Sequence, residues 1–155
     1  MKKILLSTVL LLTSHLAAAE VNVDGAYVRA VPPGQMNSAA FMQLTNHDNQ
    51  DISLIAATSD AAKNVELHTH TQDNGVMRMR QINEIKLPSE QKVTLQPGGL
   101  HIMLIGLTRN LTTGENINLS LTFSDDSQQS LQIPIKDIMS MGSHKMMHKH
   151  GAKAE

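Results

Sequence analysis

Residues 64–81 read NVELHTHTQDNGVMRMRQ, and this stretch decides the fold class. Apolar and polar side chains alternate on both sides of Asp73-Asn-Gly75, as they do in two half-buried strands. Asn and Gly tolerate the positive φ angles of a tight turn, so the stretch predicts a β-hairpin. Successive residues of a strand face opposite sides, so Val65 and Leu67 are expected to face a core and the two histidines to face away from it.

Similar strand-sized segments recur along the chain at intervals of about 8–12 residues, separated by Pro-Pro-Gly, Asn-Gly and Asp-Asp turns. We expect strands at Val21–Ala30, Ala39–Thr45, Ile52–Thr58, Asn64–His70, Val76–Gln81, Glu84–Leu87, Lys92–Leu95, Ile102–Leu107, Ile117–Phe123 and Gln129–Ile135. The sequence has no long helical period and no repeat of fixed length. It therefore predicts an all-β fold, either an antiparallel β-sandwich or a Greek-key barrel.

The first nineteen residues have the features of a secretory signal peptide. Lys2 and Lys3 precede an apolar stretch over 4–16 that is too short to span a bilayer as a helix. Ala17-Ala-Ala19 then supplies the small residues that a signal peptidase requires. We expect 1–19 to be cleaved, leaving no stable membrane insertion and a protein exported to a bacterial periplasm.

The composition changes again after Ile135. Residues 137–155 do not alternate and are rich in His and Met, so we expect a flexible tail that does not join the sheet. The globular domain would then span 20–136. The candidate ligands in the tail are Met139, Met141, His144, Met146, Met147, His148 and His150.

Composition excludes several classes of function. The 13 Lys and Arg nearly balance the 14 Asp and Glu, and aromatic residues are scarce, which argues against nucleic-acid binding. Cysteine is absent, so thiolate nucleophiles, Cys-ligated zinc, iron–sulfur clusters and blue-copper centres are excluded together. The ten Met and eight His remain as soft and borderline metal ligands.

Three segments each bring a pair of these ligands onto one face of an expected strand: His68 with His70, Met77 with Met79, and His101 with Met103. Thioether sulfur is soft and neutral and suits Cu(I), whereas imidazole accepts Cu(I), Cu(II) or zinc. A mixed set of His and Met therefore favours Cu(I). Met36, in the loop beside Pro-Pro-Gly, is a further candidate, although a single surface methionine is often only a filler.

The spacing of four of these residues carries a resemblance. His68, Met79, His101 and Met103 form the pattern H-x10-M-x21-H-x-M, which resembles the signature of the periplasmic PCu(A)C copper chaperones. The segments AVPPG at 30–34, NGVMRMR at 74–80 and PGGLHIML at 97–104 are also similar to that family. The resemblance covers 21–135.

It implies a cupredoxin-like β-sandwich that binds one Cu(I) at a surface site through those four residues, with His70, Met36 and Met77 as auxiliary candidates. It also implies a monomeric chaperone, not an enzyme. Such a chaperone would deliver copper to the subunit of cytochrome c oxidase that carries the CuA centre, directly or with a Sco-type copper protein. The tail resembles an extension that takes up additional copper, including Cu(II).

Two alternatives remain open from the sequence. A copper buffer or resistance protein would carry the same ligands without a specific client. A copper enzyme similar to the superoxide dismutases would use the His68-Thr-His70 pair, but the cysteines of that family are absent. A purely structural sandwich would leave the spacing of His and Met unexplained.

Overall fold

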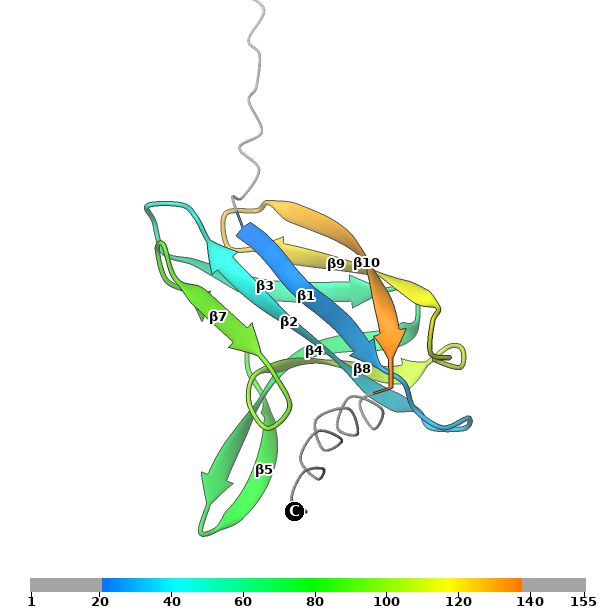
Figure 1. The fold of residues 1–155 in the computed structure, drawn as a ribbon. Coiled ribbons are helices and arrows are strands. Elements are labelled where there is room, and N and C mark those ends of the chain that lie inside the picture. The colour runs from blue at the N-terminus through cyan, green and yellow to red at the C-terminus, as the bar shows by residue number, and fades with distance from the viewer. Residues whose placement is uncertain (1–20, 138–155) are drawn as a thin grey trace, which may run out of the picture.

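The computed structural model describes residues 21–137, whose fold is shown in Figure 1. The expected signal peptide and the tail from residue 138 onward, with all of its candidate ligands, lie outside the described residues. The ten strands are β1 (Val21–Arg29), β2 (Asn37–Asn46), β3 (Ile52–Ser59), β4 (Ala62–Asp73), β5 (Val76–Gln81), β6 (Ile85–Leu87), β7 (Lys92–Leu95), β8 (His101–Leu107), β9 (Asn116–Phe123) and β10 (Gln128–Lys136).

Each strand expected from the alternation of residues is present, with bounds that differ by a few residues. The largest difference is in β4, which continues from the expected end at His70 to Asp73, next to the turn. Residues 21–137 contain no helix, and therefore none that could cross a membrane. The expectation of an all-β fold is confirmed.

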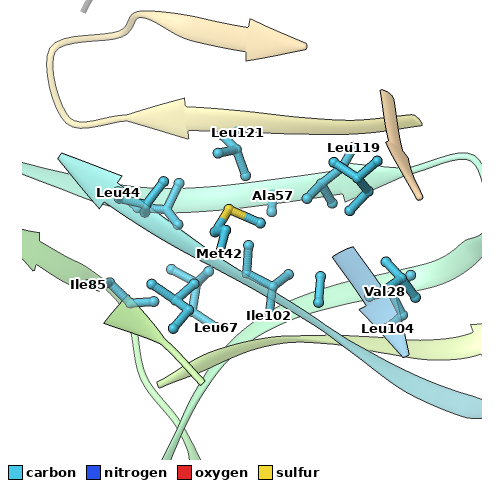
Figure 2. Close-up of a cluster of buried hydrophobic side chains, with 14 of the residues drawn as sticks. Val28, Met42, Leu44, Ala57, Leu67, Ile85, Ile102, Leu104, Leu119 and Leu121 are labelled. Carbon is cyan, nitrogen blue, oxygen red and sulfur yellow. The ribbon is translucent and has the colours of Figure 1, made fainter. Parts of the chain in front are cut away.

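The strands follow the order β5-β4-β8-β2-β1-β10-β9-β3-β6, and β7 pairs with β2. The neighbouring strands pair antiparallel except β1 and β10, which are parallel and join the two halves of the fold. The sheet does not close, so the arrangement is a sandwich and not a barrel. The two halves enclose the core, as Figure 2 shows with Leu119 and Leu121 of β9 facing Met42 of β2 and Ile102 of β8.

The core is mostly aliphatic, with Phe123 of β9 as its aromatic member, and its residues come from nearly every strand. Met42 is 2% exposed, in phase with Ala40 and Leu44, as the alternation of β2 predicts. Ile102 and Leu104 of β8 are fully buried, and burial of one such side chain stabilises the fold by about 1.5–3 kcal/mol. Because these residues face inward, the residues that alternate with them in β8 face the opposite side of the sheet.

The hairpin of β4 and β5 extends beyond the body of the sandwich (Figure 1). We name residues 71–81, the outer part of this hairpin, the arm. Asn74 and Gly75 have φ angles of 49° and 82°, which is the left-handed conformation expected for this turn. β5 pairs with β4 alone, and all six of its residues are exposed. The arm therefore carries its side chains into solvent at one edge of the sheet.

Candidate metal centre

The register of three neighbouring strands gathers the sequence-predicted ligands on one face. His68 of β4 lies directly opposite His101 of β8, and His70 lies opposite Met79 of β5. Directly opposed residues of an antiparallel pair project to the same face with their Cβ atoms about 4.5–5.5 Å apart. Met103 is two residues after His101 and thus shares its face. This is the face opposite the core, on the outer side of the sandwich.

Three imidazole rings form the centre of this cluster. The ring centroid of His101 is 5.7 Å from that of His68 and 5.1 Å from that of His70. Phe41 of β2 lies on the other side of His101, with the ring centroids 6.3 Å apart. His70, which is outside the four-residue pattern, is therefore as close to His101 as His68 is.

His101 is more buried than the surface site suggested by the sequence, since it is only 2% exposed. Its Nδ1 lies 3.0 Å from the carbonyl oxygen of Gly99, in the loop before β8. A carbonyl oxygen can only accept a hydrogen bond, so Nδ1 carries the proton and donates it. The lone pair of the neutral ring is then on Nε2. The same carbonyl is 3.4 Å from Nδ1 of His70, a long and weak contact.

Burial lowers the pKa of His101, because the charged imidazolium loses hydration in this position. The hydrogen bond to Gly99 opposes this shift, and the positive charges of His70, His68 and Arg29 add to it. The net direction is downward. His101 thus keeps the neutral form that a metal ligand needs to lower pH than an ordinary histidine does.

His68 is held by a carboxylate that is not part of the His/Met pattern of the sequence. Its Nε2 lies 2.7 Å from Oε2 of Glu66, two residues earlier on the same face of β4. Its Nδ1 is buried and has no hydrogen-bond partner in the described structure. An unpaired buried polar atom costs about 1–3 kcal/mol. The sequence signal for Glu66 was its spacing from His68, whereas nothing in the sequence indicated the Gly99 carbonyl.

The methionines differ from the histidines in exposure. Met79 is 52% exposed on the arm, and Met103 is half-buried beside Glu66. Met77 shares the face of Met79, but it lies opposite Gln72, one pair nearer the turn. The cluster thus combines a mostly buried imidazole part with an exposed sulfur on the arm.

Met36 lies apart from these residues. It precedes β2, is 55% exposed, and its carbonyl accepts a hydrogen bond from the backbone N–H of Leu107. Leu107 is the last residue of β8 and His101 is the first, so Met36 lies beside the far end of that strand. The structure does not bring Met36 to the imidazoles.

Within residues 21–137, no group of three or more His, Cys, Asp or Glu side chains could hold a metal ion. The outer face offers instead imidazole nitrogens from two strands and thioether sulfurs from β5 and β8. This combination of donors suits a soft, singly charged cation such as Cu(I). The fold and the register together define an all-β domain that carries a His/Met cluster on the outer face of its sheet.

The family follows from comparison with known sequences. Residues 21–135 match the family described as "Putative lipoprotein LpqE-like", and the chain belongs to this family. It is 36% identical over 118 residues to a "Putative lipoprotein" of Leifsonia xyli subsp. xyli, which covers 76% of this chain and 70% of that protein. It is also 29% identical over 100 residues to an uncharacterized protein of Rickettsia prowazekii, covering 64% of this chain and 55% of that protein.

Solved structures show the same fold. The Cu(I)-bound protein DR1885 of Deinococcus radiodurans is 34% identical, has a TM-score of 0.63, and the match covers 80% of this chain and 81% of that one. The copper-bound PCuAC domain of PmoF2 has a TM-score of 0.66 at 20% identity, and the match covers 78% of this chain and 96% of that domain. At this level of identity, the likeness supports the fold alone. The fold is the cupredoxin-like β fold of the PCuAC domains, as the resemblance implied.

Proposed function

We propose that this protein is a copper chaperone that binds one Cu(I) as its cargo through His68, Met79, His101 and Met103. The observation that carries the proposal is the strand register, which places His68 opposite His101 and positions both methionines on the same outer face. The relatedness to DR1885, whose solution structure holds Cu(I), supports the same cargo.

The chemistry of the donors suits reversible binding. Two imidazole nitrogens and two thioether sulfurs are neutral, and thioethers bind Cu(I) without first losing a proton. His101 is held by Phe41 and by the Gly99 carbonyl, and His68 is held by Glu66. Two of the four proposed ligands are therefore organised before the metal arrives. Binding then costs little ordering of this part.

The exposure of Met79 supplies a route for release. We propose that a ligand of the receiving protein approaches from the arm and replaces Met79 first, while His101 still holds the ion. No electron moves in this step, since one bond from sulfur to Cu(I) is exchanged for another ligand bond. The large difference in exposure between Met79 and His101 supports this order.

We propose the subunit of cytochrome c oxidase that carries CuA as the client, reached directly or through a Sco-type protein, on the strength of the resemblance in the motif. The tail from Met139 to His150 would take up additional copper, including Cu(II), because imidazoles suit that ion. The lipoprotein names of the relatives support a cell-envelope location. We propose that this location is the periplasm, reached after cleavage of 1–19.

Copper transfer distinguishes a chaperone from a copper buffer. The Cu(I)-loaded protein is mixed with an apo CuA domain or with a small-molecule chelator of matched affinity, and the rate of loss of Cu(I) is measured. A chaperone should transfer to the apo domain faster than to the chelator, with a rate that saturates as the apo domain increases. Equal rates that depend only on spontaneous dissociation would support a buffer.

A further inference from the structure

The two ring nitrogens of His68 have different surroundings. Nε2 lies 2.7 Å from the Glu66 carboxylate, and Nδ1 is buried without a partner. The described residues hold one other such buried side-chain atom, Oε1 of Gln129 in β10. A buried polar atom without a partner in a native fold needs an explanation.

The tautomer of His68 follows from the chemistry of its partner. An ionised carboxylate can only accept hydrogen bonds, so Nε2 carries a proton. In the neutral ring, Nδ1 is then a buried lone pair without a partner, whereas in the charged ring it would be a buried N–H donor with no acceptor. His101 is in the opposite state, with its proton on Nδ1 and its lone pair on Nε2.

We propose that Glu66 is a positioning residue of the Cu(I) site, which makes His68 bind copper through Nδ1 while His101 binds through Nε2. This inference rests on the proposed function. Glu66 does not touch the metal in this arrangement. It holds the ring orientation and the tautomer of a ligand.

The strand geometry explains why Glu66 can do this. Glu66 and His68 are two residues apart in β4, so they lie next to each other on the outer face. Their partners in β8 are Met103 and His101, respectively. The carboxylate therefore lies beside two proposed ligands, and its hydrogen bond to Nε2 leaves Nδ1 as the nitrogen available to the ion.

The test is a two-bond ¹H–¹⁵N NMR spectrum of the full chain at pH about 8, well above the ordinary imidazole pKa of about 6.5. The signals of His68 are assigned by their loss in His68→Gln. Without copper, His68 should be protonated on Nε2 and His101 on Nδ1. With one equivalent of Cu(I), Nδ1 of His68 and Nε2 of His101 should shift while the other two nitrogens stay protonated.

A proton on Nδ1 of His68 before copper is added, or a copper-induced shift at its Nε2, would overturn the inference and leave the proposed function standing. Failure to bind Cu(I) at all would remove both. The two failures are therefore distinguishable in one series of spectra.

Two substitutions at Glu66 separate positioning from simple packing. Glu66→Gln keeps an oxygen that accepts from Nε2, so the tautomer should persist and the Cu(I) affinity should change by less than about threefold. Glu66→Leu removes the acceptor, so both tautomers of His68 should appear and the affinity should fall by about 10–100-fold. Glu84, which is exposed in the loop before β6, provides the matched control Glu84→Leu.

Urea unfolding of each variant identifies any loss of affinity that comes only from misfolding. Equal losses of affinity in Glu66→Gln and Glu66→Leu, or an unchanged tautomer in Glu66→Leu, would overturn the positioning role.

Discussion

His68 and His101 lie directly opposite each other on β4 and β8, with ring centroids 5.7 Å apart. Both rings belong to packed strands in the body of the sheet, whereas Met79 belongs to the exposed arm. The imidazole part of the proposed site is therefore organised before copper binds. In the proposed site, the sulfur of Met79 would be ordered only by the ion, so it would be the ligand that a partner displaces most easily.

Substitution of Met79 should reduce copper binding without affecting the fold. Met79→Leu removes a soft donor at an exposed position, so the Cu(I) affinity should fall at least about tenfold while the free energy of unfolding changes by less than about 0.5 kcal/mol. Met36→Leu is the matched control, because Met36 is equally exposed and lies outside the cluster. Competition with a chromogenic Cu(I) chelator measures the Cu(I) affinity of both variants. An equal loss in Met36→Leu would show that the outer face does not define the site.

Substitution of Met42 should give the opposite result. This side chain fills the core between β2 and β9, so Met42→Ala should lower the free energy of unfolding by about 2–5 kcal/mol. The Cu(I) affinity per folded molecule should stay within about twofold of the wild type. Urea unfolding and the chelator competition give the two values, and a specific loss of affinity in Met42→Ala would contradict the separation of core and site.

X-ray absorption should detect sulfur around the reduced ion. Two thioethers and two imidazoles bind Cu(I) in the proposed site, so the spectrum of the Cu(I)-loaded protein should require both sulfur and nitrogen scatterers. Met103→Leu roughly conserves the side-chain volume, and it should remove about half of the sulfur contribution. A shell of nitrogen and oxygen alone would exclude the proposed ligand set.

The stability of the copper-free protein should fall as the pH falls below about 6.5. Burial lowers the pKa of His101 in the folded state, so the unfolded chain binds the proton first as the pH decreases. The contribution of His101 to the free energy of unfolding is fully present above the pKa of the unfolded chain. It is lost as the pH falls from that value to the lowered pKa of His101 in the folded protein. In His101→Gln, the free energy of unfolding should depend less steeply on pH, with the slope reduced by the equivalent of less than one proton per molecule. Identical slopes in urea unfolding between pH 5 and 8 would contradict this.

Removal of the tail should separate the two proposed copper activities. β10 ends at Lys136, so truncation after Ile138 leaves all ten strands intact. The truncated protein should bind one Cu(I) with unchanged affinity and should lose the additional Cu(II). Copper stoichiometry under reducing and oxidising conditions measures this. Unchanged Cu(II) stoichiometry after truncation would remove the role of the tail.

Local sequence patterns were sufficient to predict the strands and the hairpin of this fold. Alternation identified the strands, and Asn74-Gly75 identified the hairpin, because side-chain direction and turn geometry depend on neighbouring residues. The same alternation separated Met42, which is buried, from Met79, which is exposed. The spacing of His68, Met79, His101 and Met103 identified the candidate ligands, but only by resemblance to a family and not by physical necessity.

Pairing between distant strands was decided by the tertiary structure alone. No local pattern states that β4 lies between β5 and β8, since this arrangement depends on how the whole sheet buries its apolar face. The burial of His101 against Phe41, its hydrogen bond to the Gly99 carbonyl and the distance of Met36 from the imidazoles all follow from that pairing and from the backbone of one loop. Alternation could place Glu66 and His68 on one face, but only the folded geometry joins the carboxylate to Nε2 and leaves Nδ1 free, because a side-chain torsion angle has no signature in sequence spacing.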